Sequence, residues 1–193
     1  DCQKEAEKLI RSKIKKGYVE DENFNFLNRL YIDSEEYGLN PKTSHPRFSE
    51  HFNDEIYYSG GDEDAPFGSD EGHDTLICIF EVVRKNPNFD YSAFSRKLIE
   101  QDWGMEYIPV DTLDANEVMK MAMDKEMDMI QSDMVTYATA FAQIKITGAI
   151  SSELKERGIK AIKRLALIYG VPWNENEIQR KMVEDLQSFN FIL

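Results

Sequence analysis

The sequence predicts a mainly α-helical protein, a compact multi-helix domain with little or no β-sheet. Apolar residues recur at steps of three and four along most of the chain, which is the periodicity of an amphipathic helix. The sequence shows no alternation of strand and helix patterns, which argues against Rossmann and barrel folds. Apolar residues make up 41% of the 193 residues, so the chain can bury a core.

Charge and composition exclude several classes of protein. The net charge is −13, and a chain this acidic is a poor nucleic-acid binder as a whole, because phosphate contacts need Lys and Arg. No apolar run approaches the ~18 residues of a membrane span, and none resembles a signal peptide, so we expect a cytoplasmic protein without membrane contact. Cys2 and Cys78 are far apart and fit a reduced compartment, and Cys78 is expected to be buried.

The first segment of the chain differs in charge from the rest. Residues 1–19 hold six Lys or Arg against three acids, whereas the remainder carries a net charge of −16. Residues 2–16 fit a helix that Gly17 ends, and residues 23–33 carry apolar side chains at the spacing of a second helix. We expect this basic segment to belong with a partner.

A loop with Gly and Pro at residues 38–43 is the expected domain boundary. It divides the chain into a helical tail with its linker, 1–40, and a helical domain, 41–193. The chain begins at Asp1 with residues that already fit the middle of a helix, so we expect an excerpt of a longer protein.

Local signals predict the elements that follow. Pro46 can open a short helix with Ser44 as its cap, and residues 56–58 are β-prone. Asp74 is the expected N-cap of a strongly apolar helix, and Asp90 is the expected cap of the next one.

The longest periodic segment begins at Asp114 and Glu117, which have capping-box spacing. Its apolar stripe consists of Met119, Met123, Met127, Ile130, Met134 and Ala138. We interpret this stripe as core, because Met fills irregular gaps, and an adaptable partner groove is the alternative. Met121 and Met129 lie off the stripe.

Two further helices are predicted after this segment. Gly148 ends it, Ser151 or Ser152 caps the next helix, and Gly170 ends that helix in turn. Asn174 is the expected cap of the last helix.

An acidic loop gives the sharpest chemical hypothesis. Carboxylates crowd between residues 62 and 74 and repel one another unless a positive charge neutralises them. A hard cation such as calcium takes oxygen ligands, and a softer metal takes His. The candidate metal ligands are Asp62, Asp64, Asp70, His73 and Asp74. The spacing does not fit an EF-hand, because Pro66 and Phe67 occupy positions that the EF-hand pattern gives to other residues.

The structural interpretation of this loop is favoured over the metal site. Asp74 serves as a helix cap, and the other acids form Asx turns or face the positive end of the helix. Gly68 and Gly72 would allow positive φ, and Phe67 would anchor the loop in the core. No cofactor is then required, and a divalent cation remains the alternative.

No catalytic constellation is present in the sequence. The GxSxG, P-loop, HExxH and GxGxxG patterns are missing. The sequence therefore favours a protein without catalytic activity, and no catalytic residue is assigned. The basic positions Lys160, Lys163 and Arg164 are interpreted as a solvated helix face.

Residues 5–19, which end in Lys15-Lys16-Gly17-Tyr18-Val19, resemble the closing helix of a WGR domain, although the Trp-Gly-Arg core is absent. The resemblance implies that DNA contact, which WGR domains make in poly(ADP-ribose) polymerases, would come only through the missing core.

Residues 44–190 resemble the bacterial YfeS-like proteins. The similar strings are His45-Pro46, residues 64–76 around Pro66-Phe67-Gly68, and residues 138–148. The resemblance implies a relative of the molybdate metabolism regulator that is associated with a WGR domain. It favours a non-catalytic interaction or regulatory module with a protein partner, against a metal-binding protein or metal-dependent enzyme.

The last of these strings contains polar side chains in an apolar helix, Gln143 and Lys145. We hypothesise that Lys145 pairs with Asp70 or Asp74 and neutralises the acidic loop without metal.

Overall fold

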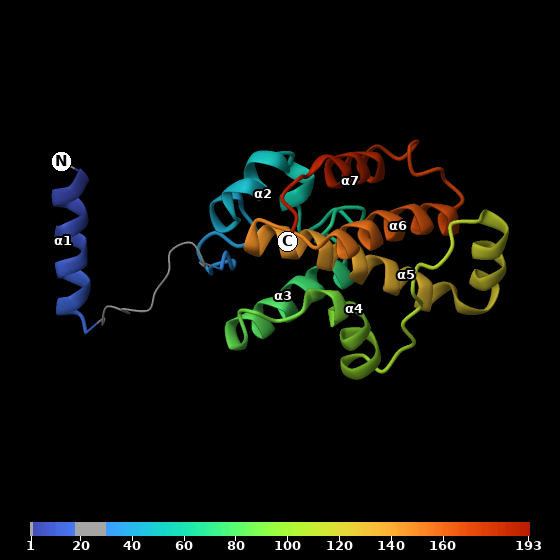
Figure 1. The fold of residues 1–193 in the computed structure, drawn as a ribbon, viewed down its shortest axis with the longest axis horizontal. Coiled ribbons are helices and arrows are strands. Elements are labelled where there is room, and N and C mark those ends of the chain that lie inside the picture. The colour runs from blue at the N-terminus through green and yellow to red at the C-terminus, as the bar shows by residue number, and fades with distance from the viewer. Residues whose placement is uncertain (1, 18–29) are drawn as a thin grey trace.

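The structure is a computed structural model that describes residues 2–17 and 30–193 (Figure 1). It confirms the mainly α-helical fold. Within these ranges the α-helices are α1 (Cys2–Lys15), α2 (Pro46–His51), α3 (Asp70–Lys85), α4 (Phe94–Lys97), α5 (Ala115–Thr147), α6 (Ser152–Tyr169) and α7 (Glu177–Ser188). Shorter 3₁₀ or π turns cover Pro41–Thr43, Glu55–Tyr58, Tyr91–Ala93 and Leu98–Asp102. The β pairing in the same ranges is limited to isolated bridges, Ser34–Gly38 and Ile150–Ile192.

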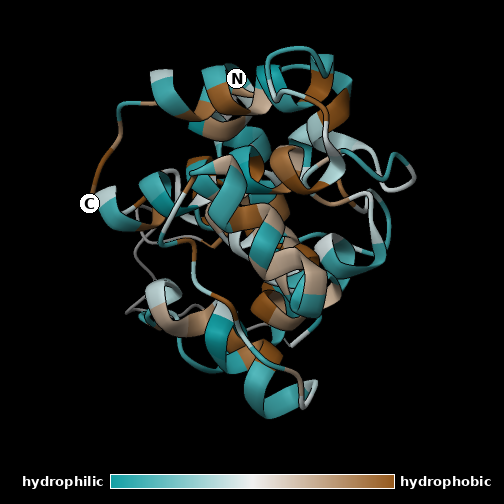
Figure 2. Ribbon diagram, turned by 90° about the vertical axis from the view of Figure 1, so that its right-hand side faces the viewer, coloured by the Kyte–Doolittle hydropathy of each residue, from teal (hydrophilic) through white to brown (hydrophobic). Residues whose placement is uncertain are grey.

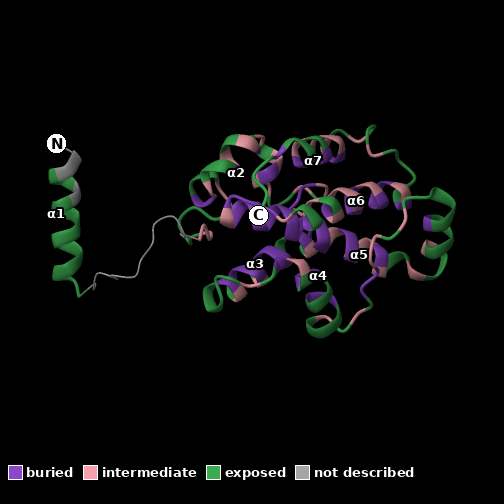
Figure 3. Cartoon of the chain, in the orientation of Figure 1, coloured by how far each residue is buried: buried purple, intermediate pink, exposed green. Residues whose placement is uncertain are grey.

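The C-terminal half of α5 forms the centre of the molecule. Every residue from Val135 to Ile146 is buried, so this part of the helix is covered on all sides (Figure 3). Helices α3 and α6 pack against α5, and α7 packs against α6. Figure 2 shows apolar and polar residues interleaved along the helices, as amphipathic helices around one core require. None of the described helices is long and apolar enough to cross a membrane.

The first helix lies apart from this body in Figure 1. The predicted apolar face of α1 includes Leu9, Ile10 and Ile14, whose side chains are 65%, 52% and 54% exposed. This segment is helical, as its periodicity predicts, but its apolar side chains are exposed to solvent.

Several predicted helix signals are confirmed. Asp114 caps α5 by accepting hydrogen bonds from the backbone N–H groups of Asn116 and Glu117, and Ser151 caps α6. Gly148 ends α5 with φ of 72°, and Gly170 ends α6 with φ of 70°, a left-handed conformation that favours glycine.

Other local predictions are wrong. Residues 56–58 lie in a 3₁₀ turn rather than a β segment, and α7 is capped by Asn176 instead of Asn174. The cap of α2 is His45, whose Nδ1 accepts from the Arg47 N–H, and not Ser44. The predicted helix 23–33 lies mostly outside the described residues, and its last four residues are not helical.

The interpretation of the methionine stripe as core is wrong in its first half. Met119, Met123 and Met127 are 48%, 84% and 62% exposed, whereas Met129, which lies off the stripe, is fully buried. A kink at Lys125, where φ of −136° and ψ of 28° are not helical, interrupts the helix in this region. Met127, two residues after the kink, is still exposed, and the first buried residue after the kink is Met129.

Candidate functional site

The acidic loop is a folded entry to α3. The helix begins at Asp70, five residues earlier than an Asp74 cap would place it, because the Ser69 hydroxyl caps it and accepts from the Gly72 N–H at 3.0 Å. Asp74 is therefore not the cap and lies exposed within the helix. Asp70 and Glu71 stand in the first turn, where the helix dipole favours acids, as expected.

The two glycines of this loop serve close packing rather than positive φ. Neither Gly68 nor Gly72 has positive φ. A Cβ on Gly68 would lie 1.9 Å from the backbone oxygen of Asp62, and a Cβ on Gly72 would lie 2.5 Å from the oxygen of Pro66. At both positions the backbone of the loop packs directly against another part of its own backbone, and only glycine fits there.

The candidate metal ligands take up separate positions. Asp62 Oδ1 accepts from the Asp64 N–H at 3.2 Å, an Asx turn, and Asp64 Oδ2 accepts from the Asn176 amide at 3.3 Å. Asp70, His73 and Asp74 are exposed on α3. In the described part of the chain, no three His, Cys, Asp or Glu side chains are grouped so that they could hold a metal ion.

Phe67 is fully buried, and it joins the main core cluster with Leu76 of α3. Cys78, in contrast, is only half-buried, and this burial raises the pKa of its thiol.

Lys145 does form a buried ion pair, but with a different partner from the hypothesised Asp70 or Asp74. Its Nζ donates to Asp33 Oδ1 at 2.6 Å and to the Thr43 backbone oxygen at 3.3 Å, and the Thr43 hydroxyl donates to the same Asp33 oxygen at 2.7 Å. Burial lowers the pKa of Lys145, and the Asp33 carboxylate opposes that shift. Lys145 therefore anchors segment 30–45 to the core. It does not anchor the acidic loop, contrary to our hypothesis.

A cavity of about 290 Å³ lies between this segment and α3. Its lining includes the acids Asp33 and Glu81, the basic groups His73 and Arg84, and the ring of Phe80. Of the five metal candidates, His73 alone lines this cavity, and Asp62 lines a separate hollow beside Ser59.

The residues that sequence reasoning missed are Arg164 and Asp133. Arg164 is buried rather than solvated, and its Nε lies 3.2 and 3.0 Å from the two Asp133 oxygens. The two terminal nitrogens donate to the backbone oxygens of Pro109 and Ile108, at 2.6 and 2.8 Å. Burial raises the pKa of Asp133 to about 7, against the opposing effect of the guanidinium. The only signal in the sequence was one acid between the apolar positions Ile130 and Met134.

The exposed first half of α5, together with Leu113 just before it, forms a second candidate site, which we call the methionine surface. Its members are the exposed apolar side chains Leu113, Met119, Met121, Met123 and Met127. Beside Met121 runs a groove of about 550 Å³, which Ile108 and the aliphatic and charged side chains of α5 complete.

This end of the molecule is acidic. Residues 106–128 contain seven Asp or Glu and two Lys. Lys125 pairs with Glu106, with 2.5 Å between Nζ and Oε1. Lys120, the other lysine of this segment, forms no ion pair with a described residue. Met is unbranched and polarizable, so such a surface adapts to apolar side chains of varied shape.

Comparison with known proteins gives the family. No family model matches the chain, and no solved structure matches it. The Escherichia coli K12 protein named "Uncharacterized protein YfeS" is 47% identical over 192 residues, which is 97% of this chain and 79% of that protein. This similarity agrees with the resemblance of residues 44–190, and the chain belongs to the YfeS family.

Proposed function

We propose that the chain is a non-catalytic interaction module, whose methionine surface binds a basic amphipathic helix. The observation that carries the proposal is the exposure of Met119, Met123 and Met127 on an ordered helix. Apolar side chains gathered on an exposed helix are typical of protein-binding surfaces.

The charge of this end of the molecule defines the class of partner. Around the methionine surface, the acids outnumber the lysines by five. The partner would be a helix with apolar side chains along one face and Lys or Arg beside them. Its apolar side chains would cover the methionines, and its Lys or Arg side chains would pair with the acids. The resemblance of residues 5–19 to a WGR closing helix supports an association with a WGR domain, whose DNA contact would lie outside this surface.

The binding test uses a designed helical peptide of Leu and Lys with an amphipathic repeat, labelled and titrated with the full chain at low protein concentration. We expect saturable binding by fluorescence anisotropy, and at least tenfold weaker binding by the double variant Met119→Gln/Met123→Gln, because each Gln replaces an apolar contact with a polar one.

The matched control is the double variant Ile77→Gln/Val171→Gln, which removes exposed apolar side chains (41% and 45%) from other parts of the surface. It should bind the peptide like the wild type. Equal binding by the wild type and the methionine variant would refute the proposal.

A further inference from the structure

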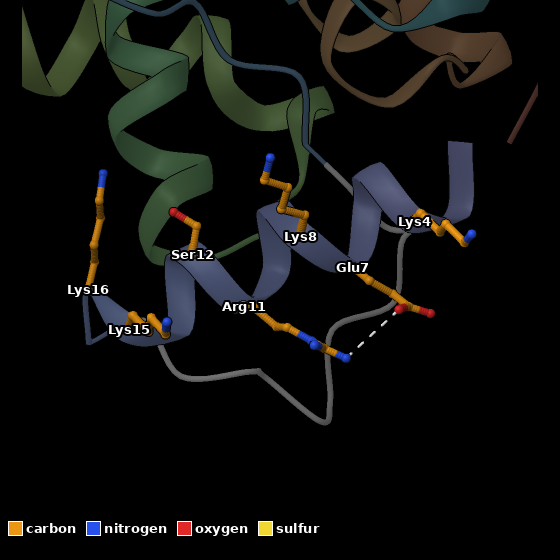
Figure 4. Close-up of a pocket in the computed structure, with 7 residues that line it drawn as sticks. All are labelled: Lys4, Glu7, Lys8, Arg11, Ser12, Lys15 and Lys16. Atoms are coloured by element: carbon orange, nitrogen blue, oxygen red, sulfur yellow. Dashed lines mark ion pairs between the residues drawn. The ribbon is translucent and has the colours of Figure 1, made fainter. Parts of the chain in front are cut away.

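The first helix has the properties of the partner just described. Along α1, Leu9, Ile10 and Ile14 form an exposed apolar stripe. Figure 4 shows the Lys and Arg side chains that extend from the same helix, with Arg11 paired with Glu7 at 4.0 Å. The helix contains five Lys or Arg against two Glu.

Helix α1 gains little stability by itself. It has 14 residues, and an isolated helix of fewer than ~12–15 residues is marginal in water even when its sequence favours helix. A hollow of about 590 Å³ lies on the polar side of the helix, lined by charged residues and Ser12, and the apolar side chains Leu9, Ile10 and Ile14 lie outside it, exposed to solvent. A surface that covers the apolar stripe would therefore stabilise the helix.

The two complementary surfaces lie at opposite ends of the molecule (Figure 1). The chain joins the body near Tyr31, whose N–H donates to the Ile146 oxygen at 3.2 Å. Met123 lies 23 residues before Ile146 in α5, and at 1.5 Å per residue this is about 35 Å of helix. Within one copy the two surfaces are therefore far apart, whereas two antiparallel copies would place α1 of each beside the methionine surface of the other.

We infer that α1 of one copy docks on the methionine surface of a second copy. This inference rests on the proposed function and names its partner as a second copy of this chain. The apolar stripe of α1 covers methionines, and the net positive charge of α1 is attracted by the net negative charge of residues 106–128. Reciprocal exchange of the two helices gives a dimer with twofold symmetry.

The test is sedimentation velocity of the full chain over a hundredfold concentration range, at low and high salt. We expect a monomer–dimer equilibrium that shifts toward monomer in high salt, because charge pairs at the surface are screened. Leu9→Gln/Ile14→Gln and Met119→Gln/Met123→Gln should each weaken the dimer at least tenfold, and Ile77→Gln/Val171→Gln should not.

Mixing the two weakened variants gives the sharpest outcome. The α1 variant keeps an intact methionine surface, and the methionine variant keeps an intact α1, so the mixture should form a heterodimer that neither variant forms alone. A wild type that stays monomeric, or dimers that persist in both variants, would overturn the inference. A monomeric wild type that still binds the designed peptide would overturn only the self-docking and leave the proposed function standing.

Discussion

Two buried cations each hold an irregular segment against α5 or α6. Lys145 fixes residues 30–45 through Asp33 and the Thr43 carbonyl, and Arg164 fixes residues 108–109 while it pairs with Asp133. A charge removed from water needs a partner and further hydrogen bonds, and both cations have them.

The Arg164 contact predicts a large effect of a small substitution. Asp133→Asn removes the carboxylate charge and leaves the guanidinium buried without its counter-ion. We expect the free energy of unfolding in urea to fall by about 3–5 kcal/mol. Asp124→Asn, at an exposed position of the same helix, should change it by less than about 0.5 kcal/mol. A similar loss in both variants would show that the ion pair has no special role.

At the scale of elements, the entry to α3 shows how tight backbone packing shapes a loop. The loop places Gly68 against the backbone of Asp62 and Gly72 against that of Pro66. Its acids are used in an Asx turn, in a hydrogen bond to Asn176 and at the helix N-terminus.

Gly68→Ala should therefore be destabilising. The added Cβ meets a backbone oxygen at 1.9 Å, and backbone cannot move away like the end of a flexible side chain. We expect a loss of about 1–3 kcal/mol in thermal or urea unfolding. Gly60→Ala is the matched control, since no atom lies within 4 Å of its added Cβ, and it should leave stability unchanged or slightly higher.

The same loop is the place to test divalent cations. Thermal unfolding is measured after EDTA treatment and after calcium, magnesium, manganese or zinc is restored. Because the candidate ligands lie apart, we expect no change in Tm with any ion. Binding to the folded state raises stability by RT ln(1 + [L]/Kd), so a shift of several degrees that Asp70→Asn abolishes would make the loop a metal site.

At the scale of the whole molecule, the core is held together by aromatic side chains from several elements. The ring centroids of Phe52 and Tyr57 each lie 5.5 Å from that of Phe141 on α5. Burial raises the pKa of the Tyr57, Tyr91 and Tyr137 hydroxyls, and that of Tyr58 to about 12. These tyrosines must remain neutral in the folded state.

The tyrosines predict alkaline unfolding. Because the pKa is raised, the folded state keeps the tyrosine protons above pH 10, where the unfolded chain releases them. The tyrosines therefore contribute fully to the free energy of unfolding below about pH 10, and this contribution is lost as the pH rises further. Tyrosinate absorbance should rise together with the loss of helical circular dichroism. Tyr58→Phe should raise the midpoint pH, because the buried Tyr58 hydroxyl has no hydrogen-bond partner among the described residues. Independent tyrosine titration without unfolding would contradict this account.

The fold class and several helix ends could be predicted from the sequence. Helical periodicity and local caps such as Asp114, Ser151 and Gly148 depend on neighbours within a few residues, so they can be read without tertiary structure. The burial of Phe67 was predictable for a similar reason, as a large apolar residue in a polar loop.

Which side chains meet could not be predicted and depends on how the helices and loops pack. The partner of Lys145 lies 112 residues away in the chain, and the backbone oxygens of Ile108 and Pro109 that bind Arg164 lie in a segment without periodicity. The kink at Lys125 and the exposure of Met119, Met123 and Met127 could not be read from the pattern, because helical periodicity assumes a continuous helix and does not say which part of it other segments cover. Ion pairs and surfaces depend on the packing of distant segments, and packing is set by the whole chain.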